Sequence, residues 1–138
     1  QDEIISGSAG EINLIFGLGG IDRITGGVLG DVICGGNGAD LIFGGAGDDV
    51  IEGGAGVDNL NGEGGNDLLR GNAGDDLLRG GAGNDELLGE AGSDNMQGEG
   101  GDDTLTGGSG ADRFDGGSGT DIATDLNRNQ GDTSVNIP

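Results

Sequence analysis

The sequence predicts an all-β solenoid, a single domain in which short strands stack coil upon coil. Three observations predict this fold class. A nine-residue pattern repeats along most of the 138-residue chain, one position of the pattern is always aspartate, and another is always apolar. A fixed period of this kind is the signature of a repeat architecture. The 37 glycines and three aromatic residues would by themselves favour disorder, but the strict period argues against it.

The repeat is clearest in residues 35–43 and 44–52, which both follow Gly-Gly-x-Gly-x-Asp-x-apolar-x. Its register continues from Gly17 to Thr124 without an insertion or deletion, which makes twelve nonapeptides. We number the positions of each unit as slots one to nine. Slot one is always glycine, and slot four is glycine except at Leu29. Slot six is always aspartate, namely Asp22, Asp31, Asp40, Asp49, Asp58, Asp67, Asp76, Asp85, Asp94, Asp103, Asp112 and Asp121.

Within each unit we expect a turn followed by a strand. Slots one to six are predicted as a turn, because glycine supplies backbone conformations that other residues rarely adopt. Slots seven to nine are predicted as a short strand with its middle side chain on one face. Two units then close a coil of eighteen residues, and the apolar slot-eight side chains form two facing columns that make the core. One column is Ile24, Ile42, Leu60, Leu78, Met96 and Phe114, and the other is Ile33, Ile51, Leu69, Leu87, Leu105 and Ala123.

The two ends of the chain depart from the period. Residues 1–16 resemble a degenerate repeat, with Asn13 in the aspartate slot and Ile15 in the apolar slot. Asp2 and Ile4 suggest an earlier unit that is displaced by two residues. Residues 125–138, which include Asp125 and Asp132, are predicted as a terminal strand and loop. We therefore expect a repeat domain at 17–124, flanked by two end segments that act as caps or as junctions.

The charge of the chain is strongly negative. It has 26 acidic and five basic residues, which gives a formal net charge of −21. Such a chain should repel nucleic acid and anionic membrane surfaces and should attract cations. Cys34 is the only cysteine, so no internal disulfide can form, and we interpret it as a small apolar filler. No apolar run has transmembrane length, and no signal-peptide pattern is present at Gln1, which fits a processed chain or a piece of a larger one.

The twelve repeats resemble the calcium-binding nonapeptides of the RTX (repeats-in-toxin) family of secreted haemolysins, proteases, lipases and adhesins. The resemblance covers residues 17–124. It implies a right-handed parallel β-roll, a β-solenoid with two nonapeptides per coil and about six coils plus irregular ends. It also implies export from the cell and folding in extracellular calcium, so we expect a secreted or cell-surface location.

The resemblance further implies one Ca²⁺ ion between each two turns that lie eighteen residues apart. The first turn would contribute its aspartate and the carbonyls of slots two and four, and the second its aspartate and the carbonyls of slots one and three. Twelve turns make ten such pairs, five on each side, so about ten ions are expected. The carbonyl ligands would be Leu18, Gly20, Gly27, Leu29, Gly35, Gly36, Asn37, Gly38, Gly44, Gly45, Ala46, Gly47, Gly53, Gly54, Ala55, Gly56, Gly62, Glu63, Gly64, Gly65, Gly71, Asn72, Ala73, Gly74, Gly80, Gly81, Ala82, Gly83, Gly89, Glu90, Ala91, Gly92, Gly98, Glu99, Gly100, Gly101, Gly107, Ser109, Gly116 and Ser118.

The residue types favour calcium over other metals. Calcium prefers six to eight hard oxygen ligands, whereas magnesium requires near-octahedral geometry and retains its waters. Zinc and copper are disfavoured because the chain has no histidine and one cysteine. At Leu29 a non-glycine residue with positive φ would be strained, so this turn is expected to be reshaped and its site, between Asp31 and Asp49, to be the least regular.

The leading functional interpretation is a calcium-binding extracellular structural module. Its two core columns are small for the number of residues that must be ordered, so metal binding should supply folding free energy. An intrinsic enzyme is disfavoured because His, Lys and Tyr are absent. An ice-binding solenoid would need a continuous threonine row, and only Thr104 and Thr106 point that way. We expect no small-molecule substrate.

The alternative interpretation is a calcium-dependent filament, matrix or adhesin subunit that stacks head to tail. The last units leave the carbonyls of four residues unused, and the first units leave a complementary set. These are Gly108, Gly110, Gly117 and Gly119 at one end, and Gly17, Gly19, Gly26 and Val28 at the other. A heterologous contact between such ends would not close. An outer apolar row of Val32, Val50 and Leu68, beside Cys34, offers a further contact surface.

Overall fold

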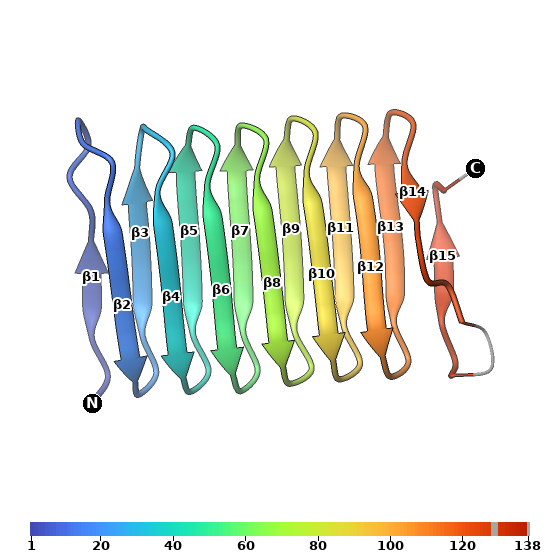
Figure 1. Ribbon diagram of the computed structural model, residues 1–138, viewed down its shortest axis with the longest axis horizontal. Helices are drawn as coiled ribbons and strands as arrows, with labels where there is room; N and C mark the ends of the chain where they lie inside the picture. Colours follow the sequence, from blue (N-terminus) through green and yellow to red (C-terminus); the bar gives the residue numbers. More distant parts are fainter. Residues whose placement is uncertain (128–129, 138) are drawn as a thin grey trace.

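The computed structural model describes residues 1–127 and 130–137, and the chain forms a flat solenoid of two parallel sheets (Figure 1). The described residues contain fifteen strands and no helix. The eight-stranded sheet has the order β1 (Ile4–Ser6), β3 (Arg23–Gly27), β5 (Leu41–Ala46), β7 (Asn59–Gly64), β9 (Leu77–Ala82), β11 (Asn95–Gly100), β13 (Arg113–Ser118) and β15 (Thr133–Val135). The seven-stranded sheet has the order β14 (Ile122–Ala123), β12 (Thr104–Ser109), β10 (Glu86–Ala91), β8 (Leu68–Ala73), β6 (Val50–Ala55), β4 (Val32–Asn37) and β2 (Leu14–Gly19).

The register of the sheets confirms the predicted coil of two nonapeptides. Neighbouring strands are parallel, and Ile42 pairs with Ile24 on one side and with Leu60 on the other. The core consists of the slot-eight side chains between the sheets, and all of them except Ala123 are buried. Ala123 is partly buried against this core, and Ile15 adds one more member at the N-terminal end. The fold class and the two core columns are therefore as predicted.

The strands are longer than predicted. A regular strand such as β5 has six residues rather than three, because it continues into slots one to three of the next unit. The pairing passes from Phe43↔Asn61 directly to Gly45↔Glu63, so the slot-one residue is skipped. The chain bends here, and slot two takes positive φ in every unit except at Gly27, even where it is not glycine. These non-glycine residues are Leu18, Glu63, Asn72, Glu90 and Glu99, with φ between 72 and 77°. Assigning slots one to three to a turn without strand structure was therefore wrong. Below, a turn means slots one to six of a unit, including the end of the strand.

The turn at Leu29 is reshaped, as expected, but not through the predicted strain. Leu29 does not take positive φ, so the expected conformational cost does not arise there. The preceding strand β3 ends one residue early, at Gly27. The next turn on this side packs closely against the altered one, because a Cβ added to Gly47 would lie 2.6 Å from the Leu29 carbonyl carbon.

The N-terminal segment adds two strands, β1 and β2, and thus about one coil, to the twelve repeats. Asn13 and Ile15 occupy the aspartate and apolar positions, as predicted. The earlier unit, however, is displaced by one residue rather than two, because Ile5 pairs with Ile24. Ile5 packs against the core, Glu3 takes the aspartate position, and Ile4 is 83% exposed. The prediction that Asp2 and Ile4 hold these positions was therefore wrong.

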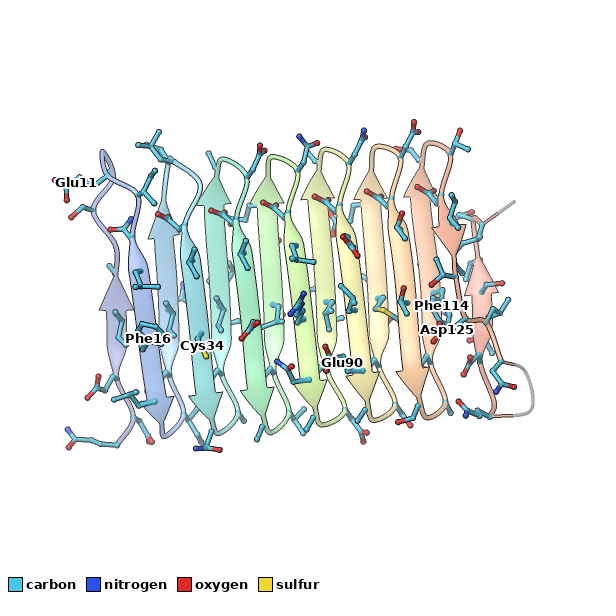
Figure 2. All side chains as sticks on the ribbon, in the orientation of Figure 1. Glu11, Phe16, Cys34, Glu90, Phe114 and Asp125 are labelled. Atoms are coloured by element: carbon cyan, nitrogen blue, oxygen red, sulfur yellow. The ribbon has the colours of Figure 1, made fainter. Side chains whose placement is uncertain are left out.

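The C-terminal segment folds onto the last coil. The amides of Gly107 and Gly108 donate hydrogen bonds to the Asp125 carboxylate, at 2.8 and 2.7 Å. β15 pairs with β13 at Arg113↔Thr133. The offset is twenty residues, two more than in a regular coil. Leu126 and Ile137 pack against the core. Figure 2 labels Asp125 at this end of the solenoid, where Phe114 is the last large residue of its core column.

Candidate metal centre

The glycine-rich turns form two rows, one along each long edge of the solenoid (Figure 1). In both rows the slot-six aspartates of successive turns are joined by hydrogen bonds. The backbone N–H of Asp40 donates to Oδ1 of Asp58 at 2.8 Å, and the N–H of Asp58 donates to Oδ1 of Asp76 at the same distance. Ten such bonds, between 2.6 and 3.0 Å, connect the ten pairs of turns in which calcium was expected. We call these two chains of bonds the inner ladders.

The second carboxylate oxygen of each of these aspartates is unsatisfied. Oδ2 is buried and accepts no hydrogen bond in any of the twelve, whose side chains are at most 3% exposed. Burial of a carboxylate without a partner costs free energy of folding, and a cation bound at this anionic oxygen would offset that cost. The cost is visible in the pKa values. Burial raises the pKa to about 6 despite the stabilising N–H donor, and it does so for Asp49, Asp58, Asp67, Asp85 and Asp94.

The position of Oδ2 explains why slot one is invariantly glycine. A Cβ added to Gly53 would lie 2.5 Å from Oδ2 of Asp58, five residues later in the same turn. The same clash with the unit's own aspartate arises at each of the twelve slot-one glycines. Side chains are excluded here because the carboxylate folds back over the start of its own turn. The sequence showed that slot one is invariant but not which atom makes it so.

Backbone carbonyls complete the turns. In the pair 35–40 and 53–58, a Cβ on Gly54 would contact the Gly36 carbonyl oxygen, and one on Gly56 would contact the Gly38 oxygen. The carbonyls of slots two and four therefore lie against the next turn of the same row. The slot-three carbonyl of Ala55 already accepts a hydrogen bond from Gly38 N–H at 2.8 Å, which leaves one lone pair for a further ligand. The predicted ligand residues thus gather in pairs of stacked turns.

This donor set suits calcium. Each pair of stacked turns contributes two carboxylates and several carbonyls, all hard oxygens of the kind that calcium prefers. Among residues 1–127 and 130–137, no three His, Cys, Asp or Glu side chains converge as a metal-binding group. Backbone oxygens would therefore have to supply most of the coordination. Such a site lacks the cysteine sulfur and histidine nitrogen donors on which structural zinc sites are built.

A second ladder, which the sequence did not predict, runs beside the inner ladder on the row of turns that contains Asp49 and Asp67. It joins residues in slot five. Oδ1 of Asp48, in slot five, accepts the N–H of Asn66 at 2.8 Å, and Asn66 Oδ1 accepts the N–H of Asn84. The N–H groups of Asp102 and Thr120 extend the series at 2.9 and 2.8 Å. Here the acceptor precedes the donor, whereas in the inner ladder it follows. The available signal was the run of Asp and Asn in slot five of alternate units.

Different side chains terminate the inner ladders at the N-terminal and C-terminal ends of the solenoid. Asn13 N–H donates to Asp31 Oδ1, and the Asn13 amide group bonds to Ser8 and Glu11, so a neutral side chain closes one row. At the other end Asp132 accepts the N–H of Asp112 on Oδ1 and that of Asn127 on Oδ2. Both of its oxygens therefore have backbone donors, unlike those of the twelve repeat aspartates. Asp132 was predicted only as part of a terminal loop.

A parallel solenoid with rows of stacked, unsatisfied carboxylates defines a class of metal-binding repeat proteins. The sequence comparison specifies which one. The model of the RTX calcium-binding nonapeptide repeat (4 copies) matches residues 35–69, 52–87, 61–96 and 88–123. These matches together cover residues 35–123, more than half of the chain, so the protein belongs to this family. The predicted resemblance is confirmed, and calcium is the ion that these repeats bind.

No curated protein matches the chain. What is identified is a calcium-binding repeat module, and no catalytic domain was found beside it. The part of the chain that the structure describes contains no helix with the length and hydropathy of a membrane span.

Proposed function

We propose that this chain is an extracellular structural module that folds when Ca²⁺ binds between its stacked turns. The observation that supports this proposal is the two rows of buried Oδ2 atoms, twelve carboxylate oxygens in all that accept no hydrogen bond. Without a cation, this many buried charges would oppose folding. With one cation in each of the ten pairs of turns, the positive charge of about ten Ca²⁺ ions would nearly balance the net charge of −21.

The ligands of each ion are assigned by the pairing of turns. The first ion is held by the Asp22 and Asp40 carboxylates, the Leu18 and Gly20 carbonyls, and the Gly35 and Asn37 carbonyls. The same rule, moved along the chain, gives each further site. The bound ion supplies electrostatic neutralisation and cross-links the two turns. No catalytic role is assigned, because the carboxylates of the inner ladders are committed to the turns.

The location follows from affinity and concentration. Many extracellular modules bind calcium with dissociation constants of about 10⁻⁴–10⁻³ M. Calcium sites built from turns that must fold around the ion suit this range, which extracellular calcium concentrations reach. A chain that needs calcium to fold would remain unfolded in the calcium-poor cytosol and would fold after export. A secreted or cell-surface location is therefore part of the proposal.

A calcium titration tests the proposal. Circular dichroism should show an unfolded chain in excess EGTA and a cooperative gain of β structure as Ca²⁺ is added. Calorimetry should give about ten ions per chain, since the inner ladders join ten pairs of turns. Magnesium is the control and should be far less effective. A β-rich spectrum that persists in EGTA would contradict the proposal.

A further inference from the structure

The two long edges of the solenoid carry the same inner ladder but differ in slot five (Figure 1). We name the two series of turns the Asp49 row and the Asp58 row. In the Asp49 row, four slot-five N–H groups donate to the slot-five side chain of the preceding turn, at 2.8–2.9 Å. The residues of this second ladder are Asp48, Asn66, Asn84, Asp102 and Thr120. In the Asp58 row, slot five of the first three turns has no side-chain acceptor, because its residues are Ile21, Ala39 and Val57.

The later turns of the Asp58 row are only partly joined through slot five. Asp75 Oδ1 accepts the N–H of Ser93 at 2.8 Å, whereas Ser93 Oγ accepts that of Ala111 over a longer 3.4 Å. In the Asp49 row, the pair of turns without the bond begins at Gly30, which has no side chain. Within residues 17–124, all of which the structure describes, slot five therefore joins four pairs of turns at 2.8–2.9 Å in the Asp49 row and one pair in the Asp58 row.

The second ladder and the inner ladder hold a pair of turns in opposite directions. Asp49 N–H donates forward to Asp67 Oδ1 at 2.8 Å. From the later turn of the same pair, Asn66 N–H donates back to Asp48 Oδ1 at 2.8 Å. The pair 35–40 and 53–58 has, at these two slots, the forward bond alone. Two reciprocal bonds constrain the relative position of two turns more tightly than one bond does.

The side chains of the second ladder are not among the proposed calcium ligands. Those of Asp48, Asn66, Asn84 and Asp102 are exposed, whereas the slot-six carboxylates are buried and keep Oδ2 without a hydrogen bond. A slot-five bond therefore supports the stacked turns without using a ligand of the ion. Calcium affinity depends on the rigidity of a site as well as on its charge. Because calcium binding is coupled to the ordering of the turns, a bond that stabilises the ordered pair lowers the calcium concentration that the pair requires.

We propose that the slot-five side chains of the second ladder are positioning residues that make the two rows of calcium sites unequal. The four joined pairs of the Asp49 row fill at lower calcium concentration than the first three pairs of the Asp58 row. The chain therefore takes up calcium in at least two steps, one edge before the other. The inference rests on the proposed function, because it concerns the same sites between stacked turns.

Loss of the second ladder tests the proposal in the Asp49 row. The double substitution Asn66→Ala and Asn84→Ala removes the acceptors of two central bonds, those made by the N–H groups of Asn84 and Asp102. The net charge of the chain does not change. We expect the calcium midpoint of this row to rise by about two- to tenfold for each lost bond, the effect of a typical hydrogen bond on an equilibrium constant. The midpoint of the Asp58 row should change much less.

Gain of the same bonds tests the proposal in the Asp58 row and does not depend on how well the first variant folds. Ala39 and Val57 are exposed slot-five residues of consecutive turns. In the register of the second ladder, Ala39→Asn and Val57→Asn together supply acceptors for the N–H groups of residues 57 and 75. This substitution also leaves the net charge unchanged. We expect the calcium midpoint of the Asp58 row to fall by about two- to tenfold for each added bond, which narrows the difference between the rows.

A calcium titration of the full chain, followed by NMR at single amides, measures the two rows separately. The Asp67 N–H reports the pair of turns that Asn66 joins, and the Asp58 N–H reports a pair that gains a bond in the second variant. In the unmodified chain the Asp67 midpoint should be the lower one, and calorimetry should resolve a tighter class of about four ions.

The ratio of the two midpoints decides the outcome, since a general change in the stability of the solenoid would move both by the same factor. Equal midpoints in the unmodified chain would overturn this inference alone, as would variants that shift both rows equally. A chain that is β-rich in EGTA, or that binds no calcium, would contradict the proposed function and this inference with it.

Discussion

Asp58 accepts the backbone N–H of Asp40 on Oδ1 at 2.8 Å, while its Oδ2 is buried without a hydrogen-bond partner. One carboxylate thus has two separate roles. The first oxygen fixes the spacing of two turns, and the second is left for a cation. Because the same division recurs in all twelve repeat aspartates, removal of the charge and removal of the hydrogen bond can be separated by mutation.

Replacement of a central aspartate should harm calcium-dependent folding more than replacement of a terminal one. Asp76 is linked to Asp58 and Asp94, whereas Asp121 is linked within the repeats to Asp103. Asp76→Asn keeps the Oδ1 acceptor but removes the anionic ligand from two sites, and Asp121→Asn removes it from one. We expect a loss of about 1–3 kcal/mol for each affected site, measured from the calcium midpoint of folding. Equal shifts in the two variants would count against ligands shared between neighbouring sites.

A side chain at slot one should block the turn. Gly53→Ala would place a Cβ 2.5 Å from Asp58 Oδ2, so either the carboxylate or the backbone must move. We expect a loss of about 1–3 kcal/mol in folding free energy and a higher calcium midpoint. Gly64→Ala is the control, because nothing lies within 4 Å of a Cβ at that slot-three position. If both substitutions are tolerated equally, the steric explanation of slot one is wrong.

The metal-free chain should gain β structure on acidification. Burial raises the pKa of Asp49, Asp58, Asp67, Asp85 and Asp94 from 3.8 to about 6. Folding therefore favours the protonated carboxyls. Below about pH 4 these carboxyls are largely protonated in the unfolded chain as well, so the metal-free fold does not carry the cost of burying charged carboxylates. As pH rises through about 6, the buried carboxyls must ionise and the metal-free fold loses stability. Circular dichroism in EGTA should show more β structure near pH 4 than at pH 7.

The calcium-loaded chain should respond to pH in the opposite direction, since protons compete with the ion for the same carboxylates. Acidification through about pH 6 should therefore raise the calcium midpoint. A metal-free spectrum that is independent of pH between about 7 and 4 would show that the buried carboxylates do not oppose folding.

Loss of the Asp125 carboxylate should loosen the last coil and leave the middle unchanged. Asp125→Ala leaves the amides of Gly107 and Gly108 without acceptors. We expect this to lower the local stability of the last coil by about 1–3 kcal/mol. Hydrogen exchange at these two amides should accelerate by about tenfold or more, while central amides keep their protection. Glu86→Ala removes the same charge from an exposed position on β10 and serves as the control. Uniform acceleration along the solenoid would mean that Asp125 does not act locally.

The repeat alone determined most of the fold. A fixed offset of eighteen residues brings equivalent slots together, so one correct register specifies every coil, and Ile42 between Ile24 and Leu60 follows directly. The same offset paired the twelve aspartates. The apolar slot had to be the core, because no other position of the repeat is apolar in every unit.

Only the tertiary structure decided what happens where the period fails and where atoms must be distinguished. The pairing of Ile5 with Ile24 and of Thr133 with Arg113 uses offsets of nineteen and twenty residues, which depend on how a loop closes. Which carboxylate oxygen of Asp58 meets Asp40, and which one excludes a side chain at Gly53, depends on the rotation of the side chain within the turn. A repeat pattern records that a position is constrained, but the direction of a single oxygen atom is set by the neighbouring coil.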